Sequence, residues 1–440
     1  MPSTNFNDSP PDRGELDTAV VRILTFRLVP FLFLLYIVAY LDRINLGFAA
    51  LQMQRQLGFT DSVYGLGAGI FFAGYFLFQV PSNLVLGRVG ARRWIAVLMV
   101  MWGIVSASMC MVTGVRSFYT LRFLLGAAEA GFFPGVILYL KTWFPAQARA
   151  RTVARFMTAA PLSGVVGGPL SGALLGLQGK SGLAGWQWMF LLEGVPAIGL
   201  GAIAWIYLVD RPENAAWLTP EQKSWLERVL QNEKIEVAQS QGRGAIQVWP
   251  ILVLSLVYFG VNTVSYGVSL WLPTLIKSLS GMSNLAIGVL SALPYVTAAI
   301  AMVFVGLHSD QSRERRWHTA APAFAGALAL SVAAHTNSVG ATTALISVAV
   351  LGVFSMMGPF WAMPTALLSG TAAAVGVAAI NSIGNLGGFF GPYTIGALRN
   401  STGSFKQGLL VVGAALAISG CLALTLKYRE RGDVENSTRG

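Results

Sequence analysis

Long apolar segments separated by short polar breaks make up most of the chain. A helix needs about 20 apolar residues to cross a bilayer, and twelve segments reach this length. They lie near residues 23–51, 60–86, 94–114, 118–143, 152–178, 186–209, 248–276, 284–307, 318–336, 340–368, 372–398 and 405–427. The pattern therefore predicts an all-α membrane protein with twelve transmembrane helices.

The longest polar break divides these segments into two groups of six. A short repeat supports the division, because GRVGARRW at 87–94 and DQSRERRW at 310–317 each follow the second segment of their group. Duplicated halves joined by a linker are typical of secondary transporters. The predicted layout is an N-terminal tail at 1–21, a first half at 22–209, a linker at 210–247, a second half at 248–428 and a C-terminal tail at 429–440.

Composition and charge agree with this class of protein. Hydrophobic residues make up 54% of the chain and charged residues 11%, whereas soluble domains carry about 25% charged residues. The net charge of +11 could indicate nucleic-acid binding, but 22 of the 30 Lys and Arg residues fall on one side of the predicted membrane. This asymmetry follows the positive-inside rule. It predicts cytoplasmic termini, a location in the cell membrane (the inner membrane if the protein is bacterial) and no nucleic-acid partner.

No catalytic or cofactor motif is recognisable in the sequence. The chain has no Walker loop, metal-ligand cluster or nucleophile elbow, and His308, His318 and His335 are scattered at loops and helix ends. Cys110 and Cys421 lie in apolar segments and imply no disulfide framework. We therefore expect no enzyme activity, no cofactor, no metal site and a monomer in the bilayer.

Charged residues inside apolar segments are the strongest candidates for function. Asp42 and Arg43 lie within YIVAYLDRINLGF at 36–48. A charge at bilayer depth costs about 2.5 to 3.5 kcal/mol on insertion scales, so such residues face a bundle interior or a wet cavity. Two interpretations are open: an ion pair that locks two helices together, or a site that handles charge in the membrane.

Three further charged residues extend this picture. Asp42 and Glu129 each lie about eight residues, or roughly 12 Å, from the outer end of their segments. Arg122 precedes Glu129 by seven residues and so lies on the same helical face. With Arg43, these residues would form a formally neutral cluster of four charges, either a locked network or a functional site. Glu193 has no basic partner in its own segment, and we expect a structural hydrogen bond there.

Uncharged polar residues recur at helical spacing in several segments. Such stripes face either a cavity or a neighbouring helix. The stripes comprise Tyr36 and Tyr40; Tyr75 and Gln79; Tyr258, Asn262 and Tyr266; and Asn381 and Asn385. Trp361 lies between two prolines, where a broken helix could line a cavity, although simple packing is an equal alternative.

Several longer motifs carry a family resemblance over residues 22–428. They are YLDRINLGFA at 40–49, VPSNLVLGRVGARRW at 80–94, RFLLGAAEAGFFPGVILYLKTWFP at 122–145, GWQWMFLLEGVPA at 185–197, WLPTLIK at 271–277 and INSIGNLGGFFGP at 380–392. Together they resemble the major facilitator superfamily and, within it, the anion:cation symporter family. The segments at 122–145 and 185–197 resemble tartrate-type members.

The resemblance implies roles for individual residues. Asp42 and Glu129 are expected to couple protons, Arg43 to bind the anionic substrate, and Arg122 to tune the two acids. The spans that line the cavity in this superfamily mark a further group as substrate-binding candidates. These are Tyr40, Tyr75, Gln79, Tyr266 and Asn385, with Trp361 as a candidate aromatic wall.

The repeated basic loops are expected to act as gates. Their candidate residues are Arg88 and Arg92 in the first half and Asp310 and Arg315 in the second. The superfamily normally has an acid at the first position of this loop, and here that position is Gly87. The first half is therefore expected to lack one acid-to-helix contact.

These features predict a proton-coupled symporter that imports a small organic anion. A substrate carboxylate that pairs with Arg43 would displace the neighbouring acid, which would then favour its protonated form, so substrate and proton would bind cooperatively. A hydroxy or dicarboxylic acid is the favoured substrate, with an aromatic carboxylate as the close alternative. An exporter or exchanger, or a membrane sensor derived from a transporter, remain alternative functions.

Overall fold

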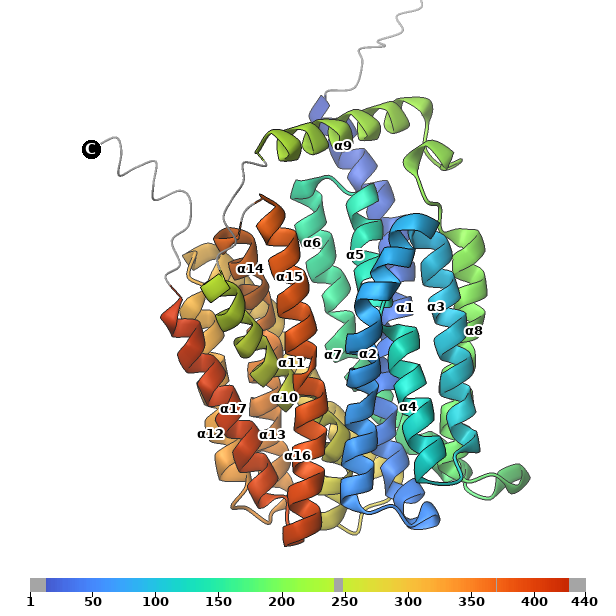
Figure 1. Ribbon diagram of the computed structural model, residues 1–440, viewed down its shortest axis with the longest axis vertical. Helices are drawn as coiled ribbons and strands as arrows, with labels where there is room; N and C mark the ends of the chain where they lie inside the picture. Colours follow the sequence, from blue (N-terminus) through green and yellow to red (C-terminus); the bar gives the residue numbers. More distant parts are fainter. Residues whose placement is uncertain (1–12, 241–247, 369, 427–440) are drawn as a thin grey trace, which may run out of the picture.

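The computed structural model describes residues 13–240, 248–368 and 370–426. This part of the chain folds into helices that run side by side in one bundle (Figure 1). The helices of the first half are α1 (Arg13–Leu57), α2 (Asp61–Val89), α3 (Ala91–Ser108), α4 (Val115–Glu129), α5 (Phe132–Trp143), α6 (Ala146–Met157), α7 (Ala159–Leu174) and α8 (Gly185–Tyr207). Helix α9 (Pro220–Ser240) follows within the linker.

The second half has the same order of elements. Its helices are α10 (Val248–Leu279), α11 (Asn284–Ser312), α12 (Arg316–Ala333), α13 (Val339–Ser355), α14 (Met357–Leu367), α15 (Gly370–Asn385), α16 (Gly387–Thr402) and α17 (Lys406–Thr425). In each half the fourth and fifth predicted spans are broken into two consecutive helices. The breaks lie between α4 and α5, between α6 and α7, between α13 and α14, and between α15 and α16.

The helix lengths agree with twelve crossings. Ten described helices or joined pairs are long and apolar enough to span a membrane. Helix α12 packs between α13 and α17, and the α15–α16 pair packs against α2 and α10. These two elements correspond to the two remaining predicted spans, so each half contributes six membrane-spanning elements to the described bundle.

Close helix pairs join the two halves, namely α1 with α10, α2 with α16, and α7 with α11. Glycines make the closest of these approaches possible. A Cβ on Gly168 would lie 2.4 Å from the carbonyl oxygen of Gly288, and a Cβ on Gly65 would lie 2.7 Å from that of Pro392. Small residues let membrane helices pack backbone to backbone, so these contacts need glycine.

Helix α9 marks one end of the bundle, here called the α9 end (Figure 1). It lies across the first half, and the Glu233 carboxylate holds it there. One carboxylate oxygen pairs with Arg149 at 2.5 Å and the other accepts the backbone N–H of Ala146 at 3.1 Å. The opposite end, called the far end, contains the starts of α2 and α11 and the end of α16.

Candidate functional site

An ion pair between α1 and α4 forms the centre of the candidate site. Arg43 Nε donates to Glu129 Oε2 at 2.6 Å, and Arg43 Nη1 donates to the Tyr266 hydroxyl of α10 at 3.2 Å. Arg43 is 8% exposed and Glu129 is fully buried. Arg43 Nη2 and Glu129 Oε1 have no hydrogen-bond partner among the described residues. Each member of the ion pair therefore has one polar atom that is not engaged in a hydrogen bond.

Aromatic rings hold the guanidinium of Arg43 in position. Its carbon lies 5.3 Å from the ring centre of Tyr75 and 5.8 Å from that of Phe71, both on α2. Helix α4 approaches α2 closely because a Cβ on Gly126 would lie 1.8 Å from the carbonyl oxygen of Phe71. The glycine thus brings the Glu129 helix against the aromatic face of α2, where cation–π contacts favour an arginine.

Arg122 does not pair with either acid. It donates to the backbone carbonyls of Gly67 at 3.2 Å and Ala68 at 3.3 Å, and its guanidinium lies 4.9 Å from the Phe71 ring centre. Phe71 therefore separates the two arginines. The expected cluster of four charges is in this respect wrong, because the described salt bridges join only Arg43 and Glu129 from this group.

Asp42 faces away from this ion pair, because adjacent residues on a helix point in different directions. Its carboxylate lies against α3, where Oδ1 accepts from Ser106 Oγ at 2.8 Å and Oδ2 accepts from Trp102 Nε1 at 2.9 Å. Asn45 Nδ2 donates to Oδ1 at 3.4 Å. The two predicted coupling acids thus occupy different environments, one paired with a cation and one surrounded by neutral donors.

A cavity of about 70 Å³ lies between the two halves, next to the ion pair. Hydroxyl and amide groups line much of its wall. The polar lining residues are Tyr36 and Tyr40 from α1 and Tyr258, Asn262, Ser265 and Tyr266 from α10. Tyr266 belongs to both the cavity wall and the Arg43 contacts, so it connects the cavity to the charged group.

The remaining binding candidates lie apart from Arg43. Gln79 accepts from Ser382 of α15 at 3.1 Å, which links the two halves. Asn385 donates to the Asn381 carbonyl of its own helix at 2.8 Å. The Trp361 ring packs edge-on against Tyr258, with ring centres 5.1 Å apart, so it lies behind a residue of the cavity wall.

The repeated basic loops lie at the α9 end and differ between the halves. Arg92 pairs with Asp210 at 3.3 Å, and the Arg92 backbone N–H donates to the same carboxylate at 3.1 Å. Arg88 is exposed on the last turn of α2. Position 87 is glycine and offers no acid for the expected contact, but Asp210, which follows α8, supplies a carboxylate to the same loop.

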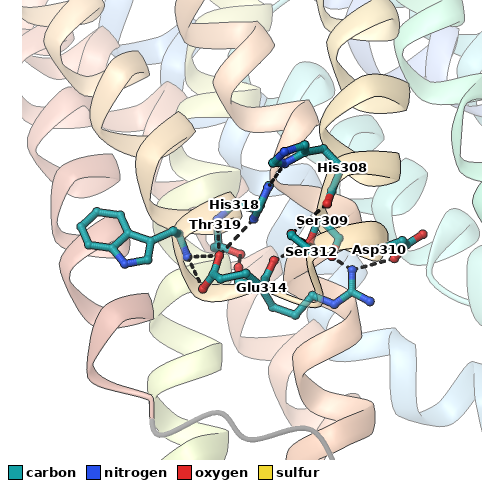
Figure 2. Close-up of polar contacts among 9 residues, drawn as sticks. His308, Ser309, Asp310, Ser312, Glu314, His318 and Thr319 are labelled. Carbon is teal, nitrogen blue, oxygen red and sulfur yellow. Dashed lines mark hydrogen bonds and ion pairs between the residues drawn. The ribbon is translucent and has the colours of Figure 1, made fainter.

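The loop of the second half contains its own network, shown in Figure 2. Arg315 pairs with Asp310 at 2.6 Å. His308 and His318 are not scattered: His308 Nδ1 lies 2.6 Å from His318 Nε2, and His318 Nδ1 lies 3.0 Å from the Glu314 carboxylate. Because a carboxylate only accepts, His318 donates through Nδ1 in this arrangement. A neutral His318 then accepts a hydrogen bond through Nε2 from the Nδ1–H of His308.

A second ion pair, not anticipated from the sequence, closes the far end between the halves. Arg399 at the end of α16 pairs with Asp61 at the start of α2 at 2.7 Å. Its guanidinium lies 4.4 Å from the Phe405 ring centre and 5.6 Å from that of Trp271. We call Asp61 and Arg399 the far-end pair. Two opposite charges at the ends of neighbouring spans are the only sequence signal for it.

Comparisons with known proteins agree with this architecture. The family model described as Major Facilitator Superfamily matches residues 32–392. A relative from Agrobacterium vitis named "Putative tartrate transporter" is 49% identical over 428 residues, which are 97% of this chain and 95% of that protein. The "Quinolone resistance transporter" of Acinetobacter baumannii is 41% identical over 398 residues, covering 90% of this chain and 92% of that protein.

Solved structures share the fold at low sequence identity. A bacterial homologue of the human lysosomal transporter Spinster, in an inward-facing and occupied conformation, superimposes with a TM-score of 0.75. The match has 18% identity and covers 90% of this chain and 96% of that chain. The predicted all-α fold with two six-helix halves is confirmed.

Proposed function

The chain belongs to the Major Facilitator Superfamily, and we propose that it is a proton-coupled symporter of a small organic anion. It is a multi-pass membrane transporter, which excludes the class of enzymes. In the proposal the protein acts as a monomer in the cell membrane, with the α9 end and both termini in the cytoplasm. The distribution of basic residues supports this orientation.

The observation that carries the proposal is the Arg43–Glu129 pair with one unpartnered polar atom on each residue. A guanidinium has a planar fork that binds a carboxylate through two hydrogen bonds. A substrate carboxylate can use Nη2 and then compete with Glu129 for Nε. Glu129, once displaced into a fully buried position without its cation, favours proton uptake. Substrate and proton therefore bind cooperatively and cross the membrane together.

The class of substrate follows from the site and from the relatives. Phenol and amide groups of the cavity wall suit the hydroxyl groups of a hydroxy acid. The name of the Agrobacterium vitis relative points to tartrate, which has two carboxylates and two hydroxyls. We propose a small hydroxy or dicarboxylic acid of this kind, bound with one carboxylate at Arg43 and hydroxyls at Tyr40 and Tyr266.

Alternating access would use the contacts at the two ends of the bundle. In this conformation the far-end pair and the glycine contacts between α2 and α16 join the halves on the proposed outer side. Opening toward the outside must break the far-end pair. The Arg92–Asp210 pair joins the first half to the start of the linker, and the Arg315–Asp310 pair lies within the second half. Neither pair crosses between the halves, so both can persist while the halves move apart.

The experiment uses purified protein in proteoliposomes with radiolabelled tartrate. Uptake should rise when the outside is acidic, collapse when a protonophore is added, and continue without sodium. Unlabelled dicarboxylates and aromatic carboxylates compete in parallel reactions and rank the substrates. Uptake that follows a sodium gradient at fixed pH and ignores the protonophore would overturn proton coupling.

Export is the second candidate function, because the relative from Acinetobacter baumannii is named for quinolone resistance. Quinolones are aromatic carboxylic acids, so Arg43 could bind them in the same way. The same vesicles loaded with a fluorescent quinolone distinguish the two functions. Proton-driven quinolone movement with no tartrate uptake would favour the exporter.

A further inference from the structure

A second pair of buried acids lies beside the ion pair and has no cation of its own. Asp42 is 1% exposed and Glu193 is 4% exposed. Within the described part of the chain, neither residue forms a salt bridge. Asp42 accepts from Ser106, Trp102 and Asn45, and Glu193 Oε1 accepts from Ser171 Oγ at 2.8 Å. All these donors are neutral.

The second acid approaches Asp42 from α8. Asn45 is fully buried on α1, one turn from Asp42, and its Nδ2 donates to Asp42 Oδ1 at 3.4 Å. Next to Glu193, Gly194 packs against α3 at the residue after Ser106, because a Cβ on Gly194 would lie 2.7 Å from the Ala107 nitrogen. Two buried acceptors remain in this group without a partner, namely Asn45 Oδ1 and Glu193 Oε2. Both atoms can only accept while Glu193 is ionised. A proton on Glu193 turns Oε2 into a donor.

The charges around the group also favour a proton on one of the two acids. Facing it from α4 are Glu129 and Arg122, and on α1 itself Arg43 is paired with Glu129. Among the described contacts, α3 contributes Ser106 and Trp102 and α7 contributes Ser171, all of them neutral. Two carboxylates in a desolvated region with neutral donors repel each other and are costly to keep ionised together. The group is therefore stable with one negative charge and one proton.

We propose that Asp42, Asn45 and Glu193 form a shared proton site in which the two acids hold one proton between them. Glu193 is then a further proton-coupling residue. The proposal rests on the proposed function for its role in transport. The site binds its proton on the opposite side of α1 from Arg43, so substrate does not contact it. Ionisation of one acid keeps the other protonated, and such a pair titrates in two separated steps.

The first test measures protonated carboxyl groups in the purified protein by infrared difference spectroscopy during a pH titration. This readout needs neither substrate nor transport. The wild-type protein should show a buried protonated carboxyl band at neutral pH. In Asp42→Asn, Glu193 no longer faces a second acid, so its carboxyl band should disappear at a lower pH than in the wild-type protein. A band that titrates at the same pH in Asp42→Asn and in wild type would show that the two acids do not interact and would overturn the shared site.

The second test compares Glu193→Gln with a matched buried change on α7, Ser163→Ala. Ser163 hydrogen-bonds only the Ala159 carbonyl of its own helix in the described contacts. In Glu193→Gln, Asp42 no longer faces a second acid, so the pH of half-maximal tartrate uptake should move down by about one unit, the scale expected for interacting sites. Ser163→Ala should keep the wild-type profile. Coincident profiles for Glu193→Gln and wild type would overturn the proposal.

The two tests separate this inference from the proposed function. If wild-type vesicles take up no tartrate with protons, the symport proposal fails, while the infrared titration still decides whether the acids share a proton. If uptake is proton-coupled but the infrared titration gives one simple step, only the shared site fails.

Discussion

The two halves have the same order of helices, but the interior of the first half contains buried charges and that of the second half does not, within the described residues. In the described part of the first half, five charged side chains are at least nine-tenths buried: Asp42, Arg43, Arg122, Glu129 and Glu193. The buried polar side chains described in the second half are all uncharged, and they come from Ser, Thr and Asn. The scaffold is therefore duplicated, whereas the chemistry is concentrated in one copy.

This difference has a mechanical consequence. The main charged groups find their partners within the first half, as in the Arg43–Glu129 pair. The second half contributes neutral hydroxyls such as Tyr266, which can leave Arg43 at the cost of one hydrogen bond. A half without buried charges can move past the charged one without leaving an ion unpaired in a low-dielectric interior, a loss of about 3 to 5 kcal/mol.

The largest expected effect comes from replacing the planar guanidinium of Arg43 in the charged half. Arg43→Lys keeps the charge but cannot form two parallel hydrogen bonds with a carboxylate. A loss of about 2 to 3 kcal/mol would lower uptake roughly 30-fold or more. Tyr266→Phe in the neutral half removes one hydrogen bond, worth about 1 kcal/mol, and should lower uptake only about 5-fold.

Initial rates and apparent affinities in proteoliposomes measure this contrast. Equal losses of uptake in the two variants would show that the charged half and the neutral half contribute equally to substrate binding. Near-normal apparent affinity in Arg43→Lys would show that Arg43 has a structural role only.

The second expected effect separates exchange from accumulation. Glu129→Gln mimics the protonated acid in shape but cannot release a proton. Counterflow of labelled against unlabelled tartrate should persist, and accumulation driven by a pH gradient should be lost. The variant leaves Arg43 without its carboxylate, so a monodisperse purified sample is the required control. Accumulation at the wild-type level would show that Glu129 does not couple protons and would leave Asp42 as the coupling acid.

The sequence predicted the charged centre better than its surroundings. Arg43 and Glu129 were identifiable because ionised groups are rarely placed in a membrane without a partner. The contacts of Arg122 were not, because its direction depends on the close approach of α4 to α2 at Gly126. Helical spacing gives the face on which a residue lies but not which neighbouring backbone it will meet.

Long-range partners were missed for the same reason. Asp210 lies 118 positions from Arg92, and polar residues at a helix end are ordinary in sequence. Glu193 reads as an isolated acid in its own span, and its approach to Asp42 depends on how α8 packs against α1 and α3. The twelve spans and the two halves could be predicted, since both follow from hydropathy and a repeat rather than from side-chain contacts.

The third prediction concerns the one described salt bridge that joins the charged half to the neutral half. Asp61→Asn removes the attraction to Arg399. In the wild-type pair, the Asp61 side chain is 24% exposed and the Arg399 side chain is 20% exposed. A partly buried pair of this kind is worth about 1 kcal/mol, so the population open at the far end should rise about 5-fold. Arg399→Lys, which keeps the charge, should change it less.

Accessibility of an introduced cysteine measures this shift. Ser269→Cys places a thiol on α10 near the cavity, in a background where Cys110 and Cys421 are replaced by Ser. Alkylation by a membrane-impermeant maleimide added outside should be faster in Asp61→Asn. An unchanged alkylation rate would show that the glycine contacts between α2 and α16, and not the ion pair, keep the far end closed.

The smallest expected effect distinguishes the two basic loops. In the first half the loop is held from outside by Asp210, whereas in the second half Glu314 holds its own loop (Figure 2). Its carboxylate accepts the backbone N–H of Trp317 at 2.8 Å and that of His318 at 3.1 Å at the start of α12. Partial burial alone would raise the pKa of Glu314, but these hydrogen bonds and the His318 side chain outweigh it and lower the pKa.

The sign of the pH dependence follows from this lowered pKa. A carboxyl group whose pKa is lower in the folded state contributes stability above its unfolded pKa, and this contribution is lost as the pH falls through the folded value. Glu314→Gln should therefore destabilise the protein at neutral pH by about 0.3 to 1 kcal/mol, the usual scale for an acid at a helix N-terminus. At acidic pH, where the wild-type carboxyl is also protonated, the stabilities of the two proteins should converge.

Thermal unfolding of the detergent-solubilised protein, followed by tryptophan fluorescence at several pH values, measures this difference. Glu227→Gln on the exposed face of α9 serves as the control and should unfold like wild type throughout. A stability difference for Glu314→Gln that stays constant from neutral to acidic pH would mean that Glu314 contributes through packing and not through its charge.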